Sequence, residues 1–203
     1  MRRLIVQTFL TLDGVMQAPG GPEEDTSGGF AHGGWSVSYW DEKMGEVMDE
    51  AVSAPFAMVL GRKTYDIMAA YWPHASEEEG AATFNEASKY VFSRSRPSLE
   101  WSNSTLVEGD AAQAMAGLKQ EDGPELQVHG SGNLIQTLMG ANLVDVYRLW
   151  VFPVIIGSGK RLFADGTIPS ALELVDSKLS TTGVVMGTYE TAGEIVTGTF
   201  GSA

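Results

Sequence analysis

The sequence contains no cysteine among its 203 residues. This absence excludes disulfides, thiolate catalysis and zinc sites built on sulfur, and it is typical of a reducing compartment. Histidine is also scarce, because only His32, His74 and His129 occur, and their spacing is not that of metal ligands. No metal site is therefore expected, and His129 is interpreted as a structural hydrogen-bonding residue.

Basic residues are few: 13 lysines and arginines stand against 26 acidic residues, which gives a formal net charge of -13. Such a field repels nucleic acid and anionic membranes, so neither is expected as a partner. No apolar run approaches the roughly 20 residues of a membrane-spanning helix. Gln7 and Thr8 interrupt the apolar start of the chain, which we interpret as a first strand rather than a signal peptide, and we expect a cytoplasmic protein.

Apolar, β-branched segments alternate with segments of helical periodicity. Strands are expected at 3–10, 56–60, 89–93, 105–108, 126–129 and 144–155, and helices at 40–52, 62–70, 111–118 and 133–139. This alternation predicts crossover connections and a mostly parallel sheet. Segments 172–179 and 184–191 are expected to form an antiparallel pair at the C-terminal edge, with 194–200 as a short extension. The expected fold class is α/β, with a mixed, mostly parallel sheet flanked by helices in one domain over residues 1–203.

Residues 17–34 form a glycine- and proline-rich insertion between the first strand and the first helix. Two interpretations stay open: a flexible surface loop, or a lid that closes over a site. A second unusual segment is the acidic run Glu77–Glu79, which is interpreted as a solvated helix start because carboxylates suit the helix dipole there.

Two strands end in a glycine turn that opens into a helix, at LGRKT (60–64) and VHGSGNL (128–134). Unpaired N–H groups and the helix dipole make such a turn suitable for phosphate, and small residues let phosphate approach closely. The second turn lacks the last glycine of a dinucleotide fingerprint, because Ile135 stands there. The alternative is that Gly130 and Gly132 only form a tight turn.

The first of these turns places Arg62 and Lys63 at a helix start, where cations oppose the dipole unless an anion compensates. Arg94 and Arg96 follow the next strand, and the carboxyl ends of parallel strands share one rim of a sheet. We expect these four cations to surround one phosphate-binding pocket; the alternative is that Arg62 and Lys63 simply point to water. An arginine–phosphate bond is worth ~1.5–3 kcal/mol, which favours NADP over NAD.

Three further motifs have a structural and a functional interpretation. The segment GSGK (157–160) is not a P-loop, because Val154 replaces its leading glycine and Arg161 follows the lysine, so a glycine turn is expected. Asp13 and Gly14 are typical of a turn. Asp41 is either a carboxylate stabilised at a helix start, or a carboxylate that steers a substrate N–H or relays a proton.

Taken in order, LDG, LGRKTYD, a strand ending in SR, VHGSGNL and LVDVYRLWVFPVIIGSGKRLF (143–163) resemble the dihydrofolate reductase-like superfamily. The similarity runs from about Arg3 to about Thr191 and points to the branch of riboflavin-biosynthesis reductase domains. It implies an eight-stranded mixed sheet, NADPH across the strand ends, and commonly a homodimer. The first helix departs from true dihydrofolate reductases, because residues 33–44 lack their tryptophan–proline–acid segment.

The resemblance also implies roles for individual residues. Gly61, Arg62, Lys63 and Thr64 would contact phosphates, and Ser93, Arg94 and Ser95 would lie near the adenosine 2′-phosphate. Gly130, Ser131, Gly132, Asn133 and Leu134 would hold the pyrophosphate, with Asp13 and Gly14 near the nicotinamide. To these we add Trp35 and Tyr39 for substrate stacking and Asp41 as the catalytic candidate.

The resulting hypothesis is an NADPH-dependent reductase that transfers a hydride to a small heterocyclic, carbonyl or imine substrate. One alternative is a pyrimidine reductase acting on a riboflavin precursor of the 5-amino-6-(ribosylamino)uracil type. Another is a non-catalytic, dimeric nucleotide-binding protein, because a fold by itself does not establish a function.

Overall fold

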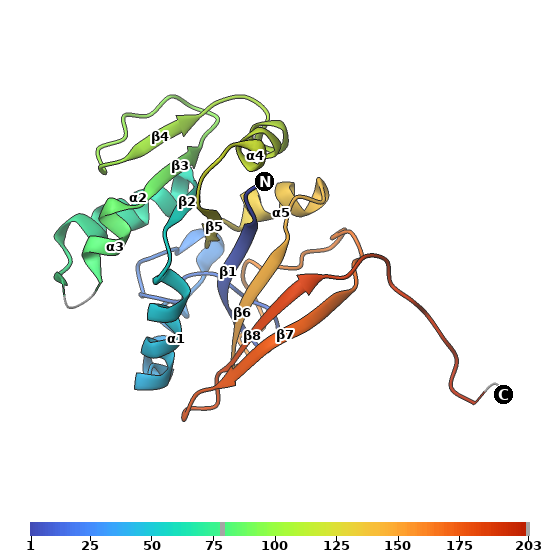
Figure 1. Ribbon diagram of the computed structural model, residues 1–203. Helices are drawn as coiled ribbons and strands as arrows, with labels where there is room; N and C mark the ends of the chain where they lie inside the picture. Colours follow the sequence, from blue (N-terminus) through green and yellow to red (C-terminus); the bar gives the residue numbers. More distant parts are fainter. Residues whose placement is uncertain (78–79, 202–203) are drawn as a thin grey trace.

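The computed structural model describes residues 1–77 and 80–201, and its centre is one sheet of eight strands in the order β4-β3-β2-β5-β1-β6-β8-β7 (Figure 1). The strands are β1 (Leu4–Thr11), β2 (Phe56–Gly61), β3 (Ser88–Phe92), β4 (Ser104–Val107), β5 (Glu125–His129), β6 (Val146–Phe152), β7 (Leu172–Leu179) and β8 (Val185–Thr191). The α-helices are α1 (Glu42–Val52), α2 (Arg62–Tyr71), α3 (Ala81–Glu86), α4 (Ala111–Gln120) and α5 (Gly132–Gly140). Short 3-10 helices among the described residues include η1 (Ser27–Gly29), η2 (Val37–Tyr39) and η3 (Trp72–His74).

The first six strands along the sheet are parallel, β8 pairs with β6 in antiparallel orientation, and β7 pairs with β8 in antiparallel orientation. The expected fold class is therefore confirmed. Strands β1 and β2 are buried along almost their whole length, as parallel strands covered on both faces must be, and this explains their near-continuous apolar sequences.

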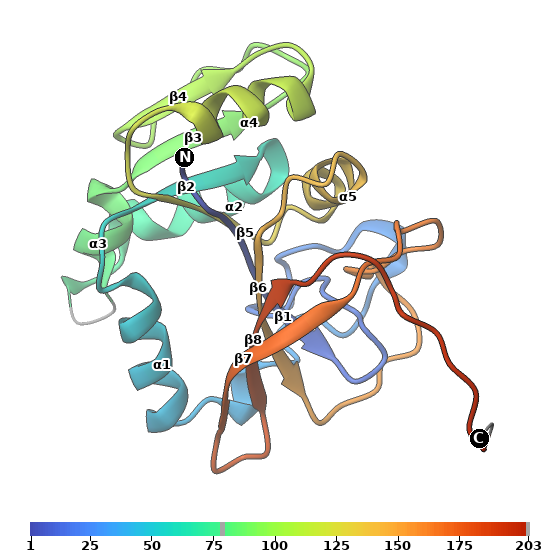
Figure 2. The same cartoon turned by 45° about the vertical axis from the view of Figure 1, so that its right-hand side comes forward.

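Helices cover both faces of the sheet, as the two views show (Figures 1 and 2). Alternate side chains of β1, such as Leu4 and Val6, pack under α4 and α5. On the opposite face, Met44 of α1 packs on Phe152, and Tyr65 of α2 lies among Phe56 and other side chains of β2. Because side chains alternate along a strand, both cores are built from the same strands.

Some expectations about the elements were wrong. The strand expected at 144–155 is only Val146–Phe152, and the segment 194–200 forms no strand. Helix α3 was not expected; its six residues are too few to show a clear helical period. Of the acidic run expected as a helix start, Glu78 and Glu79 lie outside the described residues, and α3 begins at Ala81.

Side chains of the C-terminal part of the chain, in β7 and in the segment after β8, are largely exposed. Strand β7 is one of the two edge strands of the sheet, and its side chains are exposed along nearly the whole strand. The segment after β8 runs away from the sheet in both views (Figures 1 and 2), and Val196 and Phe200 on it are fully exposed. Within residues 1–77 and 80–201, no helix is long and apolar enough to cross a membrane.

Candidate functional site

The two glycine turns lie next to each other at the carboxyl ends of the neighbouring strands β2 and β5. The backbone N–H of Gly61 donates to Ser131 Oγ at 2.9 Å, and the backbone N–H of Ser131 donates to Thr64 Oγ1 at 3.0 Å. Gly61 is the N-cap of α2, and Ser131 is the N-cap of α5. Each helix start therefore uses a group of the other, and two helix N-termini are fixed side by side.

The turn before α5 depends on a backbone conformation that favours glycine. Gly130 has φ 56° and Ser131 has φ 57°, both in the left-handed region. A Cβ at Gly130 would lie 3.2 Å from Thr64 Cγ2, tighter than ordinary van der Waals contact. Glycine is needed here both for the turn and for the close approach of α2.

The segment after β3 extends the same rim. Phe92 is in register with Gly61, so Ser93, Arg94 and Ser95 follow directly beside the start of α2. The backbone N–H of Ser95 donates to Ser93 Oγ at 3.2 Å. In the part of the chain that the structure describes, Arg94 is the one basic side chain without a hydrogen bond or ion pair.

The other three cations expected at a shared pocket are each bound to an acidic residue of this chain. Arg62 Nε contacts both carboxylate oxygens of Asp66, at 2.7 and 2.8 Å. Lys63 pairs with Asp25, and Arg96 pairs with Glu108. The unfavourable placement of cations at the start of α2 is thus compensated within the chain, and the expected free cluster of four cations is not formed.

Asp13 and Gly14 form a turn at the end of β1, as the structural interpretation proposed. The Asp13 carboxylate accepts hydrogen bonds from Thr11 Oγ1 at 2.6 Å, Ile156 N at 3.2 Å and Gly157 N at 2.8 Å, and it contacts Arg161. These bonds, that of Thr11 above all, hold the pKa of Asp13 well below its usual range. The backbone oxygen of Asp13 also accepts from Arg161 Nε at 2.8 Å, so both the side chain and the carbonyl of Asp13 are engaged within the chain.

Asp41, the catalytic candidate, caps α1. Its Oδ1 accepts from Met44 N at 2.9 Å, and its Oδ2 accepts from the backbone and hydroxyl of Thr181, each at 2.6 Å. The hydrogen bond from Thr181 is the main cause of a lowered pKa at Asp41. A carboxylate that stays ionised and is fully bonded is a poor proton donor. The structure therefore shows the helix-cap role, and a catalytic role of Asp41 stays a prediction.

The two aromatic residues expected to stack on a substrate differ in exposure. Trp35 is only 9% exposed, and its indole N–H donates to Gln17 O at 2.8 Å, so it belongs to the core and its stacking role is corrected. Tyr39 is partly exposed and lies edge-on to Phe152. Trp40, which was not selected from the sequence, is 47% exposed and stacks on Trp150 with ring centroids 6.0 Å apart. The aromatic residues between positions 35 and 40 indicated an aromatic cluster, but the sequence did not distinguish its buried rings from its exposed ones.

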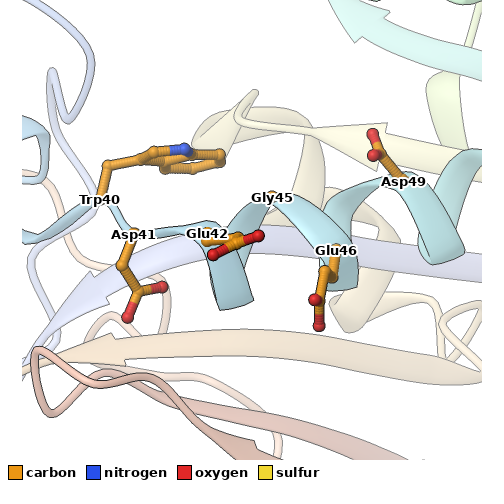
Figure 3. A pocket seen from close by; sticks show the side chains of 6 residues that line it. All are labelled: Trp40, Asp41, Glu42, Gly45, Glu46 and Asp49. Atoms are coloured by element: carbon orange, nitrogen blue, oxygen red, sulfur yellow. The ribbon is translucent and has the colours of Figure 1, made fainter.

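A hollow of about 540 Å³ lies along α1, lined by Trp40, Asp41, Glu42, Gly45, Glu46 and Asp49 (Figure 3). These residues lie on the side of α1 opposite Met44, which packs against the sheet. The residues that line the hollow are acidic apart from Trp40 and Gly45, so the hollow would repel an anionic coenzyme. This hollow therefore does not suit an anionic ligand.

The histidines are not arranged for metal binding. No group of three or more histidine, aspartate or glutamate side chains within residues 1–77 and 80–201 is suited to a metal ion. His129 contacts Gln127 Oε1 at 3.1 Å and lies against Phe56 and Phe84. Burial lowers the pKa of His129 to about 4, so it is neutral at physiological pH. This agrees with its interpretation as a structural hydrogen-bonding residue.

The comparison with protein families identifies the chain. A model of the RibD C-terminal domain matches residues 2–186. The chain belongs to the RibD C-terminal domain family. Membership confirms the resemblance drawn from the motifs and supports a reductase-type function.

Similar proteins cover almost the whole chain. Two are from Bacillus subtilis (strain 168): the uncharacterized protein YyaP, 27% identical over 192 residues (93% of this chain, 94% of YyaP), and the uncharacterized protein YwjB, 26% identical over 181 residues (87% and 91%). Among solved structures, a putative riboflavin biosynthesis protein from Shewanella sp. PV-4 has a TM-score of 0.70 at 19% identity (93% of this chain, 98% of that chain). A pyrimidine reductase-like protein from Corynebacterium diphtheriae has a TM-score of 0.65 at 12% identity (95% and 93%). The two structures show that the fold is shared.

Proposed function

We propose that this member of the family is an NADPH-dependent reductase whose coenzyme lies across the carboxyl ends of β3, β2, β5 and β1. The observation that carries the proposal is the coupling of two helix N-termini through Gly61, Thr64 and Ser131. Two adjacent N-termini offer unpaired N–H groups to two phosphates, which is what a dinucleotide requires.

The residues at the carboxyl ends of these strands fit the successive parts of such a coenzyme. Gly61 to Thr64 and Gly130 to Leu134 would hold the diphosphate, and Gly14 would lie toward the nicotinamide. Arg94, with Ser93 and Ser95, is free to receive the 2′-phosphate that distinguishes NADPH from NADH. Arg62 is less suited to that role than the sequence indicated, because its Nε already donates to both carboxylate oxygens of Asp66.

NADPH, when bound, would supply the hydride. The chain would supply orientation and exclude water, which are the contributions that a protein makes to coenzyme chemistry. Trp40, which is exposed, and Tyr39, which is partly exposed, lie near the ends of β1 and β6, and the ring centroids of Trp40 and Phe9 are 6.3 Å apart. A flat heterocyclic substrate, or a carbonyl or imine compound with an aromatic ring, would stack on them.

The test is a titration of the dialysed protein with NADPH and with NADH, followed by nicotinamide fluorescence. Wild-type protein should bind NADPH more tightly than NADH. Replacing Arg94 with alanine should weaken NADPH binding about 10- to 100-fold, since it removes about 1.5–3 kcal/mol of charge-assisted hydrogen bonding. NADH binding should hardly change.

Arg96→Ala is the matched control, because Arg96 is two residues away but paired with Glu108. It should change both affinities little. Equal losses for NADPH and NADH in Arg94→Ala would contradict the 2′-phosphate assignment. The proposal as a whole fails if wild-type protein binds neither coenzyme at high micromolar concentration.

A second candidate function is a pyrimidine reductase of riboflavin biosynthesis, which the family match itself favours. Growth of a riboflavin auxotroph lacking its own reductase, when supplied with this gene, would identify that substrate. Binding of NADPH without its consumption across carbonyl, imine and pterin compounds would instead favour the non-catalytic alternative.

We also propose that the protein is a homodimer that uses the open face of β7 and β8. Exposed apolar side chains gather there, including Leu174, Leu179 and Val185. An uncovered apolar edge strand invites association, and a two-fold symmetric pair of identical faces closes without further growth.

Light scattering after size exclusion should therefore give twice the chain mass. The double variant Leu174→Lys/Leu179→Lys should give a monomer, because two desolvated charges on each copy would oppose the interface. Val37→Lys, at another exposed apolar position, should stay dimeric. A monomeric wild-type protein would contradict this proposal.

A further inference from the structure

Two lysines from distant parts of the chain hold one carboxylate. Lys63 Nζ, at the start of α2, lies 2.5 Å from Asp25 Oδ1, and Lys160 Nζ, in the turn after β6, lies 2.6 Å from Asp25 Oδ2. The Asp25 side chain is only 11% exposed, whereas about half of each lysine side chain is exposed. Neither the resemblance nor the glycine turns assigned a role to Asp25 or Lys160.

The loop 17–34 is built to keep this carboxylate in place. Gln17 is buried, and its Nε2 donates to the carbonyl oxygens of Asp25 and Ser27 at 3.0 and 2.9 Å. Its Oε1 accepts from the backbone N–H of Lys160 at 3.0 Å. Ser27 donates from both its backbone and its hydroxyl to Asp25 Oδ1. Gln17 therefore ties the part of the loop around Asp25 and Ser27 to the segment after β6.

The Asp25 carboxylate lies next to the strand ends at which the coenzyme is proposed to bind, where a phosphate of that coenzyme could also lie. Lys63 belongs to the turn 61–64, which is coupled to the α5 turn through Thr64 and Ser131. Two ammonium groups that converge on two oxygens of one carboxylate suit two oxygens of one phosphate equally well. Lys160 would then be a phosphate-binding residue, although its GSGK segment is no P-loop.

We propose that Lys63 and Lys160 form a phosphate-binding site that Asp25 occupies when no coenzyme is bound, so that the loop and a coenzyme phosphate compete for the same two cations. The identity of the phosphate as part of NADPH rests on the proposed function. The competition itself does not, because any compound with a terminal or bridging phosphate of suitable reach would experience it.

The experiment compares wild-type protein with Asp25→Asn, which keeps the shape of the side chain and removes its charge. Two probes are titrated by calorimetry: NADPH and inorganic pyrophosphate. Asp25→Asn should bind both about 3- to 10-fold more tightly, because the lysines are released and a repelling charge is lost. Asp165→Asn, an exposed aspartate elsewhere, changes the net charge equally and should leave both affinities unchanged.

The gain should depend on Lys160. In the double variant Asp25→Asn/Lys160→Met, the increase in pyrophosphate affinity should be lost. Ser27→Ala provides a milder variant in case Asp25→Asn folds poorly, since it removes the hydroxyl bond that fixes Asp25 Oδ1 and should raise affinity in the same direction.

The outcomes separate the two proposals. If Asp25→Asn binds pyrophosphate more tightly but no form binds NADPH, the proposed function fails and the competition stands. The other result is that wild-type protein binds NADPH, but Asp25→Asn binds NADPH and pyrophosphate no more tightly than wild-type protein does. In that case the competition is overturned and the proposed function stands. Weaker binding of the two probes by Asp25→Asn would mean that Asp25 holds the loop 17–34 over the bound phosphate compound.

Discussion

Replacing Asp145 with alanine should lower the free energy of unfolding by about 3 kcal/mol, because it leaves a buried ammonium group without its counter-ion. Asp145 Oδ2 accepts from Lys119 Nζ at 2.6 Å and from the backbone N–H of Leu4 at 2.7 Å. The Lys119 side chain is only 8% exposed. One carboxylate thus joins α4, the start of β1 and the start of β6.

Urea denaturation measures this loss, with Asp122→Ala as the control at an exposed aspartate. The control should stay within about 0.5 kcal/mol of wild type. The double variant Lys119→Met/Asp145→Leu should lose less stability than Asp145→Ala, since it leaves no unpaired buried charge. A loss below about 1 kcal/mol in Asp145→Ala would show that Lys119 reaches water when its partner is removed.

The role of Asp145 shows what the sequence could and could not provide. The LVD segment lies at the start of the longest segment of the family resemblance, residues 143–163, and no role of its own was assigned to Asp145 from the sequence. In the structure Asp145 is a structural ion pair, and its partner Lys119 lies 26 residues earlier in the chain. No local pattern indicates which lysine a carboxylate will meet.

The features that the sequence predicted well are local. They include the glycine turns at Gly61 and Gly130, with the strands before them and the helices after them. These features depend on backbone conformation and on hydrophobic periodicity, and a short stretch of sequence is enough to reveal both. The neighbouring position of the two turns followed from the rule that parallel strands share a rim. The bond between Gly61 N and Ser131 Oγ agrees with that rule.

The features that the sequence did not predict depend on contacts between distant residues. Gln17 and Lys160 are hydrogen-bonded across 143 positions, and they turn a glycine-rich segment into an anchored loop. The same holds for Asp41, whose second partner, Thr181, lies in the turn between β7 and β8. Whether a carboxylate is free or hydrogen-bonded is decided by such partners, so the sequence left the helix-cap and the catalytic interpretation of Asp41 both open.

Replacing Gly130 with valine should weaken NADPH binding at least about 100-fold while the protein remains folded. A side chain in the left-handed conformation costs roughly 1–2 kcal/mol, and its Cβ would press on Thr64. The turn would relax by moving Ser131 away from Thr64, and the two helix N-termini would no longer face one diphosphate. A change of about 2.7 kcal/mol in binding corresponds to a factor of 100.

Gly166→Val separates this effect from backbone strain. Gly166 has φ 85°, and nothing lies within 4 Å of its Cβ position, so valine brings similar strain without a clash. Both variants should lose thermal stability through backbone strain, Gly130→Val the more because of the clash with Thr64, but only Gly130→Val should lose coenzyme affinity. If Gly130→Val stays folded and binds NADPH as tightly as wild-type protein, the coenzyme does not use the coupled turns. If both variants lose affinity equally, the loss reflects general stability. The contrast between two glycines of like conformation therefore tests whether the contact between Gly130 and Thr64 orders the site.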